Sequence, residues 1–271
     1  MPRPNIASPA LTREQIREYR DTGIVLLPKA VQQADINLMA DKLWDELARK
    51  FGVLRNDTKT WTKPRPAQLQ ALARGGAFAP MITPLIRDAI DHVLGAGNWD
   101  EPSSLFNPLV SFRAGNNSWE VPRRAWHVDA ALGVSHPPLA RVFVLLAPIE
   151  PQGGGTMMIA GSHILTQRLA DEAKERKLSS EEVRETLKAR YRWFEWLCSR
   201  TNRSDRTQLM SEAEVGGVKV RAVEMTGEAG DAYLMHPCVL HASTPIVRDT
   251  PRLVVSLWAS GRGDTHDRRT R

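Results

Sequence analysis

The chain has 271 residues, of which 42% are hydrophobic and 25% charged, a balance that suits one large domain with an ordinary packed core. Its formal net charge of +6 is spread along the chain and not gathered with aromatic residues, so we expect no nucleic-acid partner. No run of about 18 apolar residues is present, which argues against a membrane span or a membrane partner. The start lacks the apolar stretch of a secretory signal, and the 2 cysteines are too few for a disulfide framework, so we expect a cytoplasmic protein.

The first elements are predicted from capping residues and hydrophobic spacing. Thr12 followed by Gln15 matches a capping box, and Gly23 is a typical helix stop, so we expect a short helix between them. The apolar run 24–27 then predicts a buried strand. Apolar side chains at helical spacing predict a second helix over 34–51, with one face toward the core.

The segment 52–80 lacks any periodic pattern and is rich in Thr, Lys, Pro and Gly. Long irregular segments in compact domains are often gating loops, so we interpret this one as a lid. Trp61 and Arg65 in the lid are candidate substrate contacts, and Arg123 with Arg124 could join Arg65 at the entrance to meet an acidic or CoA-like substrate. The alternative is that Trp61 packs the loop while the cations face water.

The remainder of the chain is typical of short strands between Gly and Pro turns. Thr83 followed by Pro84 predicts one more helix, which ends near Gly95. A helical insert is expected over 162–210, and the Arg-rich end 261–271 is expected to be a flexible tail. Strands are expected over 104–113, 125–132, 141–148, 156–160, 219–225, 231–235 and 253–259. Short strands with such turns favour a jelly roll or a barrel, mainly β, with helices at the N-terminal end.

Two residues of the expected strand 125–132 have the chemistry of metal ligands. His127 and Asp129 are two positions apart, so their side chains share one face of an extended segment. One imidazole and one carboxylate suit Fe(II) better than a structural zinc site, which favours thiolates. A histidine from a neighbouring strand would complete a face of two histidines and one carboxylate, and both His236 and His241 are candidates.

Taken together, four stretches of the sequence resemble the phytanoyl-CoA dioxygenase family of Fe(II)/2-oxoglutarate-dependent oxygenases. These stretches are 126–129, 153–163, 230–243 and Arg252, and the opening 11–28 is also similar to the first helix and strand of the family. The resemblance implies a double-stranded β-helix, which is a cupin-like jelly roll, buttressed by N-terminal helices. The candidate ligands are spread from the middle of the chain almost to its end and must converge, so we expect a single catalytic domain over 1–260.

The resemblance further implies which residues bind iron. In the family a His-Pro pair is followed by three residues and then by His-x-Ser, and the histidine of the second motif is the ligand. Carried onto this sequence, the pattern names His127, Asp129 and His241 as the Fe(II) ligands and the catalytic centre, and makes His236 a neighbour of the site.

The cosubstrate residues follow in the same way. Arg252 stands where the family holds the distal carboxylate of 2-oxoglutarate, an anion that a planar guanidinium meets with two charge-assisted hydrogen bonds. Ser243 resembles the family residue that adds a hydroxyl contact to this carboxylate, and Thr156 is a further candidate for binding the cosubstrate.

These roles imply a dioxygenase that uses 2-oxoglutarate and O2 to oxidise an unactivated C–H bond of a small molecule. Family halogenases lack the carboxylate that this chain retains as Asp129, so we expect hydroxylation, with desaturation or oxidative cyclisation as alternatives. Specialised metabolism is the expected setting, for a monomer or a homodimer. The competing functions are a jelly-roll metal isomerase, which has no need of Arg252, and a catalytically silent binding protein, which has no need of an intact triad.

Overall fold

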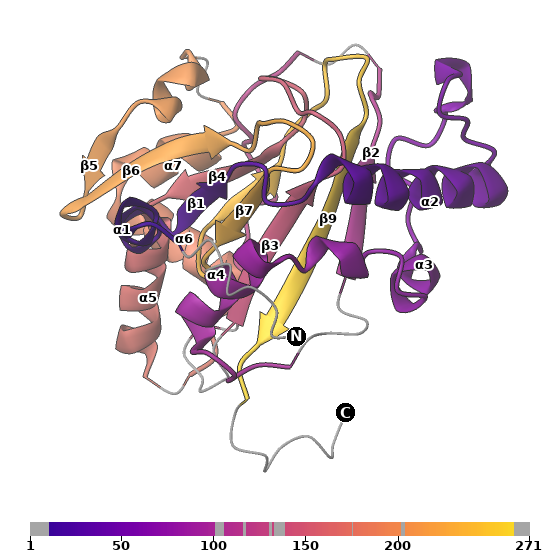
Figure 1. The fold of residues 1–271 in the computed structure, drawn as a ribbon. Helices are drawn as coiled ribbons and strands as arrows, with labels where there is room; N and C mark the ends of the chain where they lie inside the picture. The colour runs from indigo at the N-terminus through magenta and orange to yellow at the C-terminus, as the bar shows by residue number, and fades with distance from the viewer. Residues whose placement is uncertain are drawn as a thin grey trace.

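Two antiparallel sheets form the centre of the fold in a computed structural model of the chain (Figure 1). The larger sheet has the strand order β1-β7-β3-β9-β2, and the smaller sheet has the order β5-β6-β4-β8. The strands are β1 (Ile24–Leu27), β2 (Phe106–Ser111), β3 (Leu139–Leu145), β4 (Thr156–Ala160), β5 (Ala213–Val215), β6 (Val218–Glu224), β7 (Ala232–Met235), β8 (His241–Ser243) and β9 (Arg252–Ser260). The structure describes residues 11–100, 106–115, 118–129, 132, 139–174, 176–201 and 204–262.

The larger sheet is buried on both faces. Val142 and Val144 of β3 belong to the core beneath the N-terminal helices, whereas Phe143 and Leu145 belong to a core between the sheets that also contains Met158 of β4. Because side chains alternate along a strand, β3 supplies both cores, which explains its almost continuous apolar sequence. The described strands form two facing sheets and no closed barrel, so the predicted jelly roll with N-terminal helices is confirmed.

The N-terminal helices begin where their capping signals lie. In front of α1 (Arg13–Thr22), the Thr12 side chain accepts from the Gln15 N–H, and the Gln15 side chain accepts from the Thr12 N–H. Buried residues of α2 (Gln33–Phe51) and α4 (Pro84–Leu94) pack in the core on the outer face of the larger sheet. The three predicted helices are therefore confirmed.

The segment 52–80 contains more regular structure than its composition predicts. It contains the short helices η1 (Thr58–Thr60) and α3 (Gln70–Arg74), and the helix η2 (Ala79–Met81) begins at its end. Its Phe78 side chain is fully buried in the core of the outer face. The prediction of an irregular segment is therefore correct only between these helices, because scattered apolar residues hold the segment on the sheet without giving a period. Its role as a lid stays a prediction.

The helical insert is present within its predicted bounds, 162–210. It contains α5 (Ser162–Ala173), α6 (Ser180–Arg190), α7 (Arg192–Cys198) and η3 (Arg206–Met210). A capping box between Ser179 and Glu182 starts α6, and buried residues of all four helices pack with β4 and β6 in a third core. The insert therefore covers the outer face of the smaller sheet.

One predicted strand is not formed, and two observed strands were not predicted. The segment 125–132 forms no regular strand in its described part, where Ala125 has a φ of 63° and His127 pairs with His241 only as an isolated bridge. Residues 130 and 131 lie outside the described residues. Conversely, β5 and β8, each three residues long, were not predicted.

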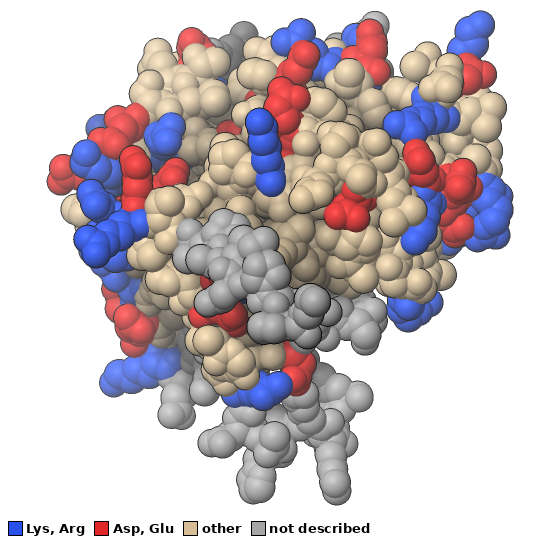
Figure 2. All heavy atoms as spheres, in the orientation of Figure 1, with Lys and Arg blue, Asp and Glu red and all other residues tan. Residues whose placement is uncertain are grey.

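No helix among the described residues is long and apolar enough to cross a membrane. The face of the molecule in Figure 2 carries basic and acidic side chains close together, with no broad area of a single sign. The expected tail lies outside the described residues from position 263 onward.

Candidate metal centre and cosubstrate pocket

Backbone pairing between distant segments brings three potential metal ligands together. The His127 N–H donates to the His241 carbonyl at 3.0 Å, and the His241 N–H donates back to the His127 carbonyl at 2.9 Å. Two residues further on, the Asp129 N–H donates to the Pro237 carbonyl at 2.9 Å. The loop 118–129 is therefore held along β8 and its approach, although it forms no regular strand.

One ligand atom from each of His127, Asp129 and His241 lies within 4.8 Å of the others. The Nδ1 atom of His127 is 3.0 Å from the Ala125 carbonyl oxygen, and that of His241 is 3.0 Å from the Val239 carbonyl oxygen. A carbonyl only accepts, so each Nδ1 is best assigned as the protonated nitrogen, which leaves both Nε2 lone pairs free. Two imidazole nitrogens and one carboxylate fit Fe(II), with coordination positions left open.

The protonation state of His241 also suits metal binding. Burial lowers the pKa of His241 to about 4, although the nearby Asp129 carboxylate opposes this shift. Its imidazole is therefore neutral near pH 7 and can offer its lone pair. Asp129 Oδ1 lies 3.6 Å from His241 Nε2, which places this oxygen on the side of the two histidines.

A buried arginine faces the other oxygen of the same carboxylate. The Nε atom of Arg141 lies 3.5 Å from Asp129 Oδ2, and its guanidinium stacks on Trp258 at 4.1 Å and Phe143 at 5.1 Å. Burial lowers the pKa of Arg141 to about 10, so it stays charged at neutral pH. Asp129 therefore presents one oxygen to the potential metal and the other to a fixed cation.

Arg252 at the start of β9 lies 6% exposed. It donates to the Gly154 carbonyl at 3.1 Å and to the Ser111 hydroxyl at 3.2 Å, while its Nε atom has no partner among the described residues. Burial, with a smaller contribution from Arg65, lowers the pKa of Arg252 to about 10. A charged guanidinium with unmet hydrogen-bonding capacity is suited to receive an anion.

The other predicted cosubstrate residues lie next to this guanidinium. Arg252 and Ser243 line a cavity of about 290 Å³ together with Arg65 and Ser111. Thr156 of β4 is the direct register partner of Ser243 on β8, and is itself buried. The strand pairing thus brings all three cosubstrate candidates to one end of the facing sheets.

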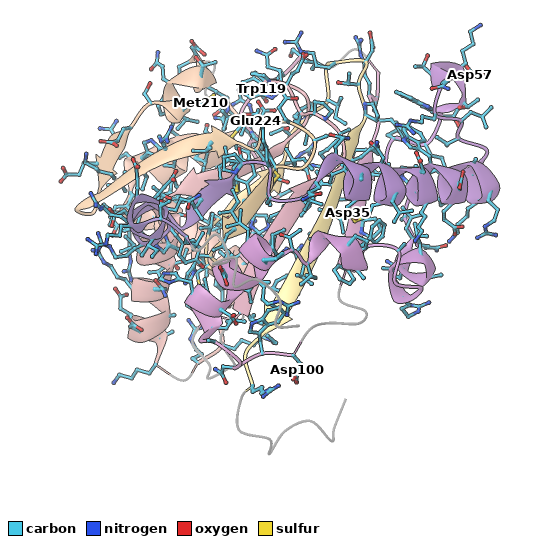
Figure 3. All side chains as sticks on the ribbon, in the orientation of Figure 1. Asp35, Asp57, Asp100, Trp119, Met210 and Glu224 are labelled. Carbon is cyan, nitrogen blue, oxygen red and sulfur yellow. The ribbon has the colours of Figure 1, made fainter. Side chains whose placement is uncertain are left out.

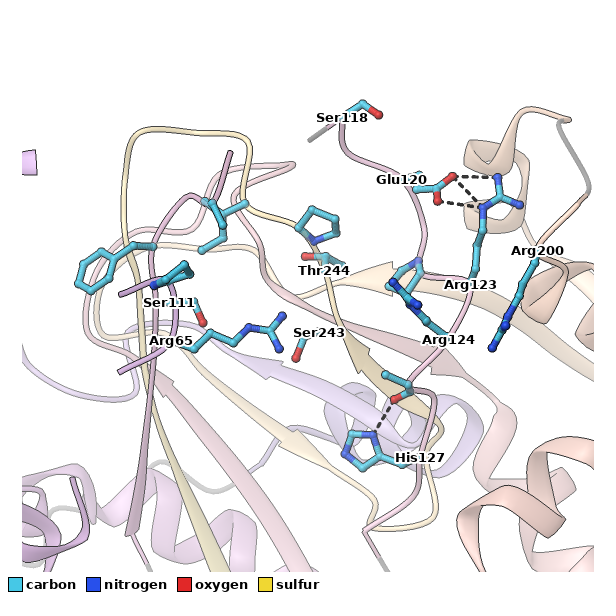
Figure 4. A pocket seen from close by; sticks show the side chains of 17 residues that line it. Arg65, Ser111, Ser118, Glu120, Arg123, Arg124, His127, Arg200, Ser243 and Thr244 are labelled. Atoms are coloured by element: carbon cyan, nitrogen blue, oxygen red, sulfur yellow. Dashed lines mark hydrogen bonds and ion pairs between the residues drawn. The ribbon is translucent and has the colours of Figure 1, made fainter. Parts of the chain in front are cut away.

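A larger cavity of about 860 Å³ adjoins the smaller one (Figure 4). Arg65, Ser111 and Ser243 line both cavities, and His127 lines the larger one. One wall of the larger cavity is the loop 118–129, whose Trp119 indole donates to the Glu224 carboxylate at 3.2 Å (Figure 3). The potential metal centre therefore opens onto a space where a small molecule can bind.

One candidate substrate contact named from the sequence, Trp61, lies outside this site. Trp61 stacks on Trp44 at 5.9 Å and on Phe112 at 4.8 Å, and its indole donates to the Leu54 carbonyl at 2.8 Å. It lines a separate cavity of about 420 Å³, so its contact with substrate stays a prediction that this packing does not support. Arg65, by contrast, does point into the larger cavity (Figure 4).

His236, the alternative third ligand, lies in a different cluster. Its ring is 5.2 Å from that of His163 and 6.2 Å from that of Tyr19, and its Nδ1 accepts from the Cys238 N–H. The sequence reasoning missed Arg141, whose only signal is a single charge within the apolar run 139–145.

The chain matches the phytanoyl-CoA dioxygenase family profile over residues 7–254. Among solved structures, it is similar to the non-heme α-ketoglutarate-dependent carbocyclase SnoK from nogalamycin biosynthesis, with 15% identity, a TM-score of 0.55, and coverage of 93% of this chain and 84% of that one. It is also similar to HygX from Streptomyces hygroscopicus, with nickel and 2-oxoglutarate bound, at 15% identity, a TM-score of 0.52, and coverage of 93% and 88%.

The non-heme monooxygenase ThoJ, in a nickel complex, shows 19% identity, a TM-score of 0.52, and coverage of 90% of this chain and 76% of that one. No curated protein sequence matches the chain. These structural likenesses agree with the fold, while the profile match extends over most of the sequence. The chain therefore belongs to the phytanoyl-CoA dioxygenase family and is an Fe(II)/2-oxoglutarate-dependent enzyme.

Proposed function

We propose that His127, Asp129 and His241 bind the iron of a dioxygenase that hydroxylates a small molecule. The observation that carries this assignment is the convergence of three ligand atoms within 4.8 Å, with both imidazoles turned so that Nε2 is free. One catalytic domain over 1–260 accompanies the proposal, because β1 near the start of the chain pairs with β7 near its end.

We assign the distal carboxylate of 2-oxoglutarate to Arg252, with Ser243 and Thr156 beside it. Arg252 supplies a fixed charge, since its two Nη atoms are already held by Gly154 and Ser111. The cavity that Arg252 lines meets the larger one at Ser243. Such an arrangement orients the cosubstrate between the guanidinium and the metal ligands.

The iron supplies the activation of O2 that oxidation of a C–H bond requires. The residues of this chain fix the geometry: Arg141 holds one oxygen of Asp129, and the Ala125 and Val239 carbonyls fix the two imidazole orientations. The larger cavity has a volume in the range of about 300 to 1,000 Å³ that is common for small-molecule sites. We therefore assign it to the substrate.

Hydroxylation is the proposed outcome, while oxidative cyclisation is the alternative that the likeness to the carbocyclase SnoK suggests. Anaerobic titration tests the assignment: Fe(II) and 2-oxoglutarate together should give the weak visible charge-transfer band of the chelate. Wild-type protein should show the band, and His241→Ala should not. Product mass then separates the reactions, because hydroxylation adds one oxygen and cyclisation removes two hydrogens.

A further inference from the structure

Four arginines line the larger cavity, and one of them, Arg123, is already paired with a carboxylate. Arg123 forms three charge-assisted hydrogen bonds of 2.9 to 3.1 Å to Glu120, and it also donates to the Ser199 carbonyl at 2.9 Å. Glu120 is the one acidic residue among those that line this cavity. The pair Arg123–Glu120 therefore contributes little net charge to the wall.

The other three lining arginines, Arg65, Arg124 and Arg200, form no ion pair with any carboxylate that the structure describes. In Figure 4, Arg65 enters from one side, next to Ser243, and Arg124 and Arg200 enter from the opposite side. Arg65 also lines the smaller cavity and acts electrostatically on Arg252. Its charge therefore belongs with the cosubstrate site, which leaves two cations unassigned.

A buried side chain holds the segments that carry these two cations together. Arg206 is 4% exposed and donates four hydrogen bonds of 2.7 to 3.0 Å to carbonyl oxygens. Two acceptors, Val121 and Pro122, lie three and two residues before Arg124 on the loop 118–129. The other two, Trp196 and Leu197, lie on α7, shortly before Arg200.

The link between these segments has a second component, because Arg123 reaches across from the loop to the Ser199 carbonyl. The bases of Arg124 and Arg200 are thus fixed relative to one another, although their own side chains are exposed. Pre-positioned guanidinium groups on a rigid frame lose less entropy when they bind an anion than cations on a mobile loop.

We propose that Arg124 and Arg200 bind an oxyanion, either a carboxylate or a phosphate, on the substrate of this enzyme. This inference rests on the proposed function, because it needs 2-oxoglutarate to be held at Arg252 and substrate in the larger cavity. His127 lines the same cavity below the two arginines (Figure 4). An anion bound there holds the far end of the substrate while its reacting carbon lies toward the metal ligands.

The charges of the site support this division. Under the proposed function, one carboxylate of 2-oxoglutarate would be held at the metal site of His127, Asp129 and His241, and the other by Arg252, near Arg65. Neither group requires Arg124 or Arg200, so both cations remain available to an anionic group of the substrate. Guanidinium forks match the two-oxygen edge of both carboxylate and phosphate.

Calorimetric titration with inorganic phosphate, and separately with acetate, tests this inference on protein loaded with Ni(II) and 2-oxoglutarate. Since 2-oxoglutarate already covers Arg252, the remaining anion binding reports on the larger cavity. The double variant Arg124→Ala/Arg200→Ala should weaken binding of the preferred anion by about tenfold or more, because it removes the charge-assisted hydrogen bonds of both guanidinium groups. The matched control Arg17→Ala, an exposed arginine on α1, should bind like wild type.

The outcomes are distinct. Tighter binding of phosphate than of acetate indicates a phosphorylated substrate, and the reverse order indicates a carboxylic acid. Equal affinity in wild type and the double variant, or no saturable binding of either anion to wild type, overturns the proposal. Two further titrations distinguish failure of the cosubstrate assignment from failure of the anion site. One repeats the anion titration on metal-free protein, and the other measures the affinity for 2-oxoglutarate. The double variant should keep its affinity for 2-oxoglutarate.

Discussion

Replacing Arg252 by Met tests the cosubstrate assignment most directly. The guanidinium is buried and already donates to Gly154 and Ser111, so its removal leaves an incoming carboxylate without a fixed cation. Loss of one partner of such a pair costs about 2 to 5 kcal/mol. We expect the lower half of this range, because Arg65 lines the same cavity and can compensate in part.

The expected result is an affinity for 2-oxoglutarate lowered by roughly 30-fold to 300-fold, at about 1.4 kcal/mol for each factor of ten. Anaerobic titration of 2-oxoglutarate into the Fe(II)-loaded protein, followed by the visible band, measures this change. The control Arg113→Met removes an exposed arginine that pairs with Asp249 and should leave the affinity unchanged. An affinity of Arg252→Met close to that of wild type would mean that another cation holds the carboxylate.

Arg252→Met should not unfold the protein. Burial of a charge with unmet hydrogen bonds is unfavourable, so a flexible apolar side chain of similar length can leave the stability of the cosubstrate-free protein unchanged or raise it. Chemical denaturation therefore separates a binding effect from a folding effect. Ser243→Ala removes a single hydroxyl and should lower the affinity by roughly fivefold.

Three further predictions follow from the same geometry. Alanine at His127, Asp129 or His241 should abolish stoichiometric Fe(II) binding measured by metal analysis, whereas His236→Ala should retain it; the reverse pattern would contradict the ligand assignment. Arg206→Met should lower the free energy of unfolding by about 3 to 5 kcal/mol in urea, because four carbonyls lose a charged donor; a loss below about 1 kcal/mol would refute this role. Burial lowers the pKa of His236 from 6.5 to about 4, so the folded state favours the neutral ring. The contribution of this group to the free energy of unfolding should be fully present above about pH 6.5 and fall as the pH approaches 4. His236→Asn keeps an acceptor for the Cys238 N–H and should make this fall shallower in urea titrations at each pH, while an unchanged pH dependence would assign the effect to other groups.

The elements that the sequence predicted well are those whose signals are local. A capping box at Thr12 and a proline in the first turn of α4 mark helix starts by chemistry that acts within one turn. The strand 156–160 lies between turns on both sides and agrees with β4 at both ends. The N-terminal helices and this strand needed no knowledge of the tertiary contacts.

The elements around the site depend on distant partners. β8 has only three residues, and its direction is set by pairing with β4 on one side and by the bridge to His127 on the other. No periodic pattern can emerge from so short a strand. The two ligand segments were found by the identity of their residues, whereas the way they meet required the structure.

The same limit applies to the cavity wall. Arg124 and Arg200 are separated in the sequence by the whole of β3, β4 and most of the helical insert, so their convergence has no local signal. A basic residue at either position is typical of a solvated surface. The buried Arg206 joins the two segments through backbone carbonyls, and Arg123 donates from one segment to the Ser199 carbonyl of the other.

The arginines that are buried among the described residues, Arg141, Arg206 and Arg252, show how structural and functional cations differ. Arg206 uses all three of its nitrogen atoms to donate to carbonyls, so its burial is explained by folding alone. Arg141 and Arg252 each retain a nitrogen without a partner, an arrangement that folding by itself disfavours. Arg141 lies beside the iron ligand Asp129, and Arg252 is the residue that we assign to 2-oxoglutarate. Unmet hydrogen-bonding capacity, more than burial, therefore distinguishes the arginines of the active site from the one that supports its frame.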